Sequence, residues 1–251
     1  MSRNNTGRTG TRSADAPILQ QEAEESKFNP LNFVAPTELV DLPSRGKGYP
    51  ESHPLHNKET IEIRFMTAKD EDILASQSLI KKGIVLERFM ENIIVNKRIK
   101  PQGLLVGDRN AIMIAARISG YGTSYETRVN CPACMEASKF DFDLSDQKVH
   151  ETDINEDLNL TLAGMGLFQT VMPFSKFKIK FKLLTGHDEA YLTKLMSNKK
   201  KGKLAESPFT DQMKRMIVEI EGHTDHSIIN KYVDNMPTLD SSHLRACYRV
   251  A

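Results

Sequence analysis

The chain has 251 residues, and its 34 Lys and Arg against 33 Asp and Glu give a net charge of +1, so no strong field draws it to nucleic acid or to an anionic membrane. Hydrophobic residues at 39% and charged residues at 27% are ordinary for a soluble folded protein. Three cysteines argue against a disulfide framework, no apolar run approaches the ~18 residues of a spanning helix, and the first residues lack the apolar core of a signal peptide.

Residues 1–41 are predicted to form a disordered or extended N-terminal arm. Residues 1–27 are mostly small or polar and include a Glu cluster, so they have almost nothing to bury against their ordering entropy. Pro and Gly between Phe28 and Pro54 indicate an extended or looped chain. An arm that becomes ordered only against a partner is the functional alternative to plain disorder.

Residues 42–184 are predicted to form an α+β core. Apolar and polar residues alternate over Glu59–Met66, as in a half-buried strand. Thr67 then has the spacing of a helix cap, with Asp70 as its capping-box partner. Two further helices are expected over residues 84–95 and 109–119 from their apolar spacing, the second capped by Asp108.

Residues 124–144 are predicted to form a hairpin with two cysteines at its tip. Ser124–Asn130 and Lys139–Leu144 read as its strands, and Cys131-Pro-Ala-Cys134 lies between them. Such a turn aims two thiolates at one point, which is the geometry of a zinc knuckle. A redox role is disfavoured because that motif needs a helix after the first cysteine.

The rest of the core is predicted to contain two more strands, Leu158–Leu162 and Phe177–Leu183. The second places Lys178, Lys180 and Lys182 on one face, a candidate contact surface. Residues 185–251 are predicted to be mainly helical, and the expected helices cover residues 187–197, 208–221, 227–233 and 240–248. No internal repeat is evident in the sequence.

A tetrahedral zinc site needs four ligands, and a second Cys-x-x-Cys is missing from this sequence. His243 and Cys247 share a face of the last predicted helix and could complete the site. His223 and His226, in a turn, are a second possibility. The bland interpretation is a turn held by its backbone alone, with Cys247 as a small buried apolar residue.

Catalytic motifs are not found: the sequence has no nucleophile elbow, paired-histidine metal motif, dinucleotide fingerprint or P-loop. Its acidic residues are explained by the first turns of helices and the polar faces of strands. No catalytic residue is therefore assigned, and the chain is interpreted as a protein that works through contacts.

Several short motifs resemble, in this order, the baseplate hub and hub-assembly protein family of T4-like contractile-tailed bacteriophages. The matching residues are Leu42–Gly46, Tyr49–Pro50, Ile63–Arg64, Met66–Ala68, Glu71–Leu74, Gly107–Asn110, Ile118, Gly120–Gly122, Cys131–Cys134, Leu239–Ser241 and Leu244–Arg245. The resemblance implies a non-enzymatic tail protein, made in the host cytoplasm and found in the virion baseplate if it is retained there. It further implies partners among the baseplate hub and tail proteins, including the tape-measure protein. Members of this family commonly continue into a second Cys-x-x-Cys segment. This sequence lacks that segment, which argues against a complete zinc site.

Two other functions remain as alternatives. A zinc-binding nucleic-acid module would need tightly bound metal and a basic face, against which the net charge argues. A tail-associated hydrolase would need a carboxylate pair, and nothing in the sequence singles one out.

Overall fold

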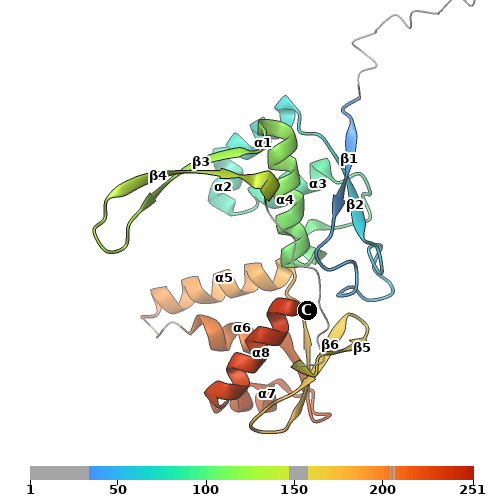
Figure 1. Ribbon diagram of the computed structural model, residues 1–251, viewed down its shortest axis with the longest axis vertical. Coiled ribbons are helices and arrows are strands. Elements are labelled where there is room, and N and C mark those ends of the chain that lie inside the picture. The colour runs from blue at the N-terminus through green and yellow to red at the C-terminus, as the bar shows by residue number, and fades with distance from the viewer. Residues whose placement is uncertain (1–33, 147–157, 204, 206) are drawn as a thin grey trace, which may run out of the picture. The chain divides into compact units, whose positions relative to one another are not determined.

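The computed structural model describes residues 34–146, 158–203, 205 and 207–251 (Figure 1). It is a mixture of α-helices and small antiparallel sheets, as the predicted α+β class requires. Buried side chains form two hydrophobic cores, the first drawn from residues 40–116 and the second from residues 160–247. Of the helices in this part of the chain, none has the length and apolar character needed to cross a membrane.

The first core is built around a two-stranded antiparallel sheet. β1 (Thr37–Asp41) pairs with β2 (Thr60–Arg64), and the predicted alternation places Ile61 and Ile63 in the core. The elements that follow are α1 (Ala68–Ala75), α2 (Gln77–Lys82), α3 (Val85–Ile93), the 3-10 helix η2 (Pro101–Gly103) and α4 (Val106–Tyr121). The assignment of Asp108 as a cap is wrong, because α4 begins at Val106 and Asp108 is a buried residue of its first turn.

After α4 the chain forms the predicted hairpin. β3 (Ser124–Asn130) pairs antiparallel with β4 (Ala137–Asp143), and the short 3-10 helix η3 (Leu144–Asp146) follows (Figure 1).

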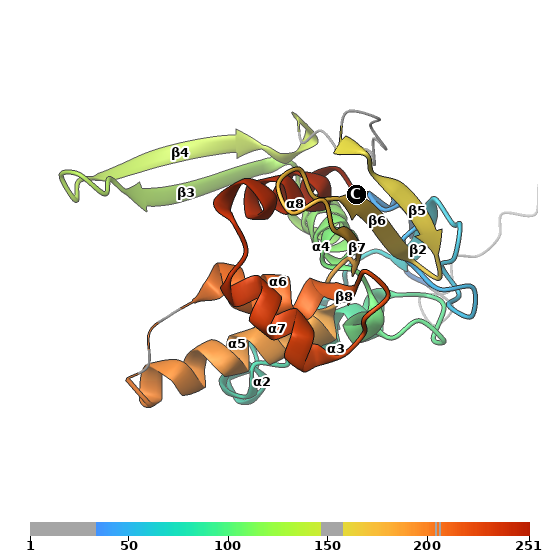
Figure 2. The ribbon, with the colours of Figure 1, turned by 90° about the horizontal axis from the view of Figure 1, so that it is seen from below.

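The second core surrounds a four-stranded antiparallel sheet in the order β5-β6-β7-β8 (Figure 2). Its strands are β5 (Thr161–Gly164), β6 (Leu167–Val171), β7 (Lys178–Lys182) and β8 (Ile217–Ile220), and its helices are α5 (Gly186–Lys201), α6 (Pro208–Met216), α7 (His226–Asp234) and α8 (Thr238–Val250).

Two predictions in this half need correction. The strand expected at Leu158–Leu162 begins only at Thr161, because the chain turns just before it, where Asn159 has a φ of +47°. The helix expected up to Glu221 ends at Met216, and Ile217–Ile220 instead pair with β7 as β8. Both ends of β8 are buried. A short buried apolar run is compatible with a helix or a strand, and in this protein it forms a strand.

The two halves repeat one arrangement of strands and helices. β1 corresponds to β6, β2 to β7, α1 to α5, α3 to α6 and α4 to α8, in the same order along the chain. The chain after α3 bridges Ile63 of β2 through Ile94, and the chain after α6 pairs with Phe181 of β7 through Ile217. Ile63 and Phe181 each lie four residues before the threonine that caps the next helix, α1 or α5. The chain after α3 and the chain after α6 therefore pair with equivalent strand positions.

The expectation that the sequence has no internal repeat is therefore wrong. Identities over residues 60–74 and 178–192 are few: Ile61 and Ile179, Thr67 and Thr185, Asp70 and Asp188, Glu71 and Glu189, Leu74 and Leu192. The other positions need only be apolar or polar to preserve the fold, so they can diverge without losing it.

Candidate functional site: the cysteine hairpin and the buried aspartates

The β3–β4 hairpin has one apolar and one polar face. Tyr125 lies opposite Phe142 and Thr127 opposite Phe140, with Val129 on the same face. The side chains of Tyr125, Val129, Phe140 and Phe142 are 44–49% exposed, although they are large and apolar. The other face carries charged and hydroxyl residues, where Ser124 donates a 2.9 Å hydrogen bond to Asp141. All but one residue of the two strands are exposed, so the hairpin buries little within the described chain.

The base of the hairpin is tied to α4 through Arg117. Its guanidinium donates to the carbonyl oxygens of Gly122 and Ser124 at 2.9 and 3.1 Å. It also stacks on the rings of Tyr121 and Tyr125, 5.0 and 5.8 Å from their centroids. The base of the hairpin is thus held by the Arg117 guanidinium, which bridges α4 and β3.

The tip of the hairpin brings Cys131 and Cys134 together. A tight turn joins them, with the Met135 N–H donating to the Cys131 carbonyl at 2.7 Å. Main-chain N–H groups of Cys134 and Ala133, and then the Cys134 side chain, lower the pKa of the Cys131 thiol. The turn therefore favours a thiolate, which is the form that binds metal.

The described residues do not complete a zinc site around this pair. They contain no cluster of three or more His, Cys, Asp or Glu side chains placed to hold a metal ion. Tetrahedral zinc requires four ligands, so the two thiols do not form a closed site by themselves. A knuckle that holds metal is thus not shown by the structure, although its two cysteines are close.

His243 and Cys247 meet elsewhere, on α8, and serve the second core. The Cys247 Sγ lies 3.4 Å from the His243 Nε2 and 3.6 Å from the Thr170 hydroxyl. Cys247 is fully buried, and burial raises the pKa of its thiol and lowers the pKa of the His243 imidazole. His223 lies in the turn after β8, and His226 is the first residue of α7. In the described chain neither pair forms a metal cluster with the hairpin cysteines.

The lysine face of β7 is partly occupied within the chain. Ile179 and Phe181 are buried as the alternation predicted. The ammonium of Lys180 lies 2.9 Å from Glu219, and that of Lys182 lies 2.8 Å from Asp188. Two of the three lysines proposed for partner contacts are therefore engaged in intramolecular ion pairs.

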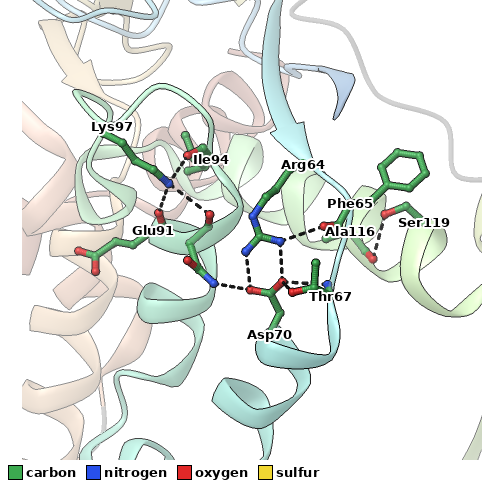
Figure 3. A network of polar contacts seen from close by, with 10 residues as sticks. Arg64, Phe65, Thr67, Asp70, Glu91, Ile94, Lys97, Ala116 and Ser119 are labelled. Carbon is green, nitrogen blue, oxygen red and sulfur yellow. Dashed lines mark hydrogen bonds and ion pairs between the residues drawn. The ribbon is translucent and has the colours of Figure 1, made fainter. Parts of the chain in front are cut away.

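Sequence reasoning assigned Asp70 and Asp108 only as capping residues, of which the Thr67–Asp70 capping box is confirmed, and it missed the larger polar sites around aspartates in the first turns of helices. Asp70 accepts both guanidinium N–H groups of Arg64 at 2.7 and 2.9 Å, the main-chain and hydroxyl groups of Thr67, and the amide of Asn92 at 2.6 Å (Figure 3). Burial alone would raise the pKa of Asp70, but these hydrogen bonds outweigh it and hold the pKa below its usual value. Nearby, Lys97 donates to the carbonyl oxygens of Glu91, Asn92 and Ile94, which closes the last turn of α3.

Asp188 has the same environment in the second half. It accepts hydrogen bonds from Lys182 at 2.8 and 2.9 Å, from the main chain and hydroxyl of Thr185 at 3.0 Å, and from Arg215 at 2.6 Å. Lys182 corresponds to Arg64, Thr185 to Thr67, and Arg215 to Asn92. Burial raises the pKa of Asp188, but the lysine, threonine and arginine donors bring it below its usual value.

Asp108 and Asp240 form a second equivalent pair. Each accepts a main-chain N–H from the segment that follows β1 or β6: Ser44 donates to Asp108 at 3.1 Å and Phe174 to Asp240 at 2.7 Å. Asp108 also accepts from the hydroxyls of Ser44 and Tyr49 at 2.7 and 2.8 Å. Burial raises the pKa of Asp108 despite these bonds, whereas the N–H groups of Phe174 and Ser175 outweigh burial and lower the pKa of Asp240.

These sites explain part of the motif set found in the sequence. Ser44, Tyr49 and Asp108 come from separate motifs and meet in one buried network, and Arg64, Thr67 and Asp70 are adjacent in another. Their role is to lock loops to helices. The signal that could have found them is an aspartate at the third position of four helices, α1, α4, α5 and α8.

A family model described as T4 bacteriophage base plate protein matches residues 36–242. The comparisons with curated proteins and with solved structures give no significant match.

Proposed function

The chain belongs to the T4 bacteriophage base plate protein family, and from that membership we propose that it is a hub subunit or hub-assembly factor of the phage baseplate. The family supports a structural protein of the tail, part of a multi-subunit assembly rather than an enzyme. We propose that it binds other hub and tail proteins, including the tape-measure protein, while the baseplate and tail tube are built.

The observation that supports binding is the apolar face of the β3–β4 hairpin. A two-stranded hairpin is marginally stable alone, and this one leaves two phenylalanines and a tyrosine about half exposed. Exposed apolar surface of this kind marks protein interaction sites. The hairpin is anchored at its base by Arg117, so it can present this face to a neighbouring tail protein without unfolding the first core.

The test is quantitative mass spectrometry of purified mature tails and of tail-assembly intermediates from infected cells. A small fixed copy number per mature tail is the result expected of a hub subunit. Presence in intermediates but not in mature tails is the result expected of an assembly factor. Absence from both would contradict the proposed function.

A further inference from the structure

The outer edge of β1 has main-chain groups that no strand of the described chain pairs with. The Phe65 N–H donates to the Pro36 carbonyl at 2.8 Å, and the Leu42 N–H donates to the Glu59 carbonyl at 2.7 Å. Between these bonds, the hydrogen-bond pattern of an antiparallel pair points the main-chain N–H and C=O groups of Glu38 and Val40 toward β2. The N–H and C=O of Leu39 point away from β2. Within the described residues the sheet contains only β1 and β2, so no strand lies on that side.

The second half of the chain shows what the equivalent edge accepts. Gln169 of β6 lies opposite Lys180, as Leu39 lies opposite Glu62 at the equivalent position of the first half. The outward side of Gln169 is not open, because β5 pairs there antiparallel with Thr161 directly opposite. As far as the described residues go, the same strand position is therefore covered by a strand in one half and uncovered in the other.

Two side chains of β1 indicate the chemistry of a missing strand. Leu39 is 70% exposed, which is unusual for an apolar residue at the centre of a strand. Glu38 has a buried carboxylate oxygen, Oε1, with no hydrogen-bond partner in the described chain. Its equivalent is Phe168, which is buried and lies opposite Leu162 of β5. A strand added to β1 would place a side chain next to Glu38 in the same way, and a hydrogen-bond donor there would satisfy the carboxylate.

We propose that the outer edge of β1 binds an extended segment of a neighbouring tail subunit, antiparallel to β1, with a donor side chain (Lys, Arg, Asn or Gln) opposite Glu38 and an uncharged side chain opposite Leu39. Main-chain hydrogen bonds give such strand addition its affinity, and the alternate side chains give it specificity. The identity of the occupant as a tail subunit rests on the proposed function, whereas the open edge does not.

The test uses two substitutions at one residue. Leu39→Pro removes the outward N–H, and a proline is tolerated on an edge strand whose N–H faces outward. Leu39→Thr keeps the N–H and is the matched control. We expect both full-length variants to unfold at the wild-type urea midpoint. Leu39→Pro should lower the amount of chain found in tails and tail intermediates about tenfold, and Leu39→Thr should not. Equal incorporation of the two variants overturns the proposal.

Hydrogen exchange of the wild-type chain gives a second readout that does not depend on the proline variant folding. The amides of Thr37, Leu39 and Asp41 should exchange rapidly in the isolated protein and about tenfold or more slowly in the assembly. Slow exchange in the isolated monomer means that another part of this chain covers the edge, and slow exchange only at high protein concentration means that a second copy does. Either result overturns the proposed occupant. If these amides are unprotected in assembled tails, the proposed binding site at the outer edge of β1 is overturned but the proposed function is not. If the chain is absent from tails and intermediates, the proposed function itself is overturned.

Discussion

Asp70 and Asp188 do the same work in the two halves. Each closes the first turn of a helix and at the same time holds a basic side chain from the preceding strand. Each also holds a third donor from the helix that leads back to the sheet, Asn92 in one half and Arg215 in the other. One carboxylate therefore joins three elements. It should contribute more to the free energy of unfolding than an exposed ion pair does.

Neutralising either carboxylate should destabilise the protein strongly. Asp70→Asn and Asp188→Asn are each expected to lower the free energy of unfolding by about 2 kcal/mol, because partly exposed cationic donors lose a buried charged acceptor. Urea unfolding followed by circular dichroism measures the loss. Asp72→Asn, an exposed position on α1, is the control and should change the free energy by less than about 0.5 kcal/mol. Equal effects at Asp70 and Asp72 would contradict the assignment.

Stability should fall as the solution becomes acidic. The folded-state pKa values of Asp70, Asp188 and Asp240 lie below the usual value, so their contribution is present above about pH 4 and is lost as pH falls through the folded pKa values. Asp108 acts in the opposite sense, because its raised pKa contributes stability that is lost as pH rises through it. Because Asp70, Asp188 and Asp240 lose their contribution over this range, we expect urea midpoints to decrease from pH 5 to about pH 3.

The Asp70→Asn variant separates this linkage from a general acid effect. It removes one of the three groups, and its urea midpoint should therefore vary less steeply with pH than that of the wild type. Parallel pH profiles for the two proteins would mean that Asp70 does not contribute to the acid transition.

At the scale of elements, the sequence predicted what periodicity and spacing determine. The strand at β2, the helix cap at Thr67 and the cysteine hairpin follow from alternation and capping residues. β8 could not be found in this way, because a short apolar run after a helix suits either structure until a neighbouring strand offers a pairing edge. The aspartate sites were missed because their donors, such as Ser44 for Asp108 and Lys182 for Asp188, are recruited by the tertiary fold.

The apolar face of the hairpin should matter for assembly and little for folding. Phe140→Ser with Phe142→Ser should change the free energy of unfolding by less than about 1 kcal/mol, because both rings are half exposed and belong to neither core. The same double variant should lower the amount of chain in purified tails. Arg128→Gln with Lys139→Gln on the opposite face is the control and should be incorporated normally. A reversed pattern would assign the contact to the polar face.

At the scale of the whole molecule, the two halves are joined by main-chain contacts. The Val106 N–H donates to the Leu184 carbonyl at 2.9 Å, and the Gly186 N–H donates to the Leu104 carbonyl at 3.0 Å. Arg109 adds an ion pair to Glu189 at 2.7 Å. A second junction lies at Gly166, in the turn between β5 and β6, which approaches the main chain of Gly48. The halves should therefore unfold together.

Gly166→Ala should weaken that coupling. A Cβ at this position would lie 2.5 Å from the Gly48 carbonyl oxygen, and φ is +74°. Gly164, the last residue of β5, has φ +80° with nothing within 4 Å of an added Cβ, so Gly164→Ala reports the backbone strain alone, about 1 kcal/mol. We expect Gly166→Ala to cost roughly 2 kcal/mol more and to broaden or split the calorimetric transition. Indistinguishable transitions for the two variants would show that the junction does not couple the halves.

The internal repeat has a consequence for symmetry. An assembly with n copies of this chain contains 2n copies of the strand–helix arrangement. The number of repeated units is therefore twice the number of chains. Each unit has an edge at the β1 or β6 position, and within residues 34–146, 158–203, 205 and 207–251 a strand of the chain covers only the second. The repeated chain can thus offer two kinds of contact in an assembly, where a single unit would offer only one.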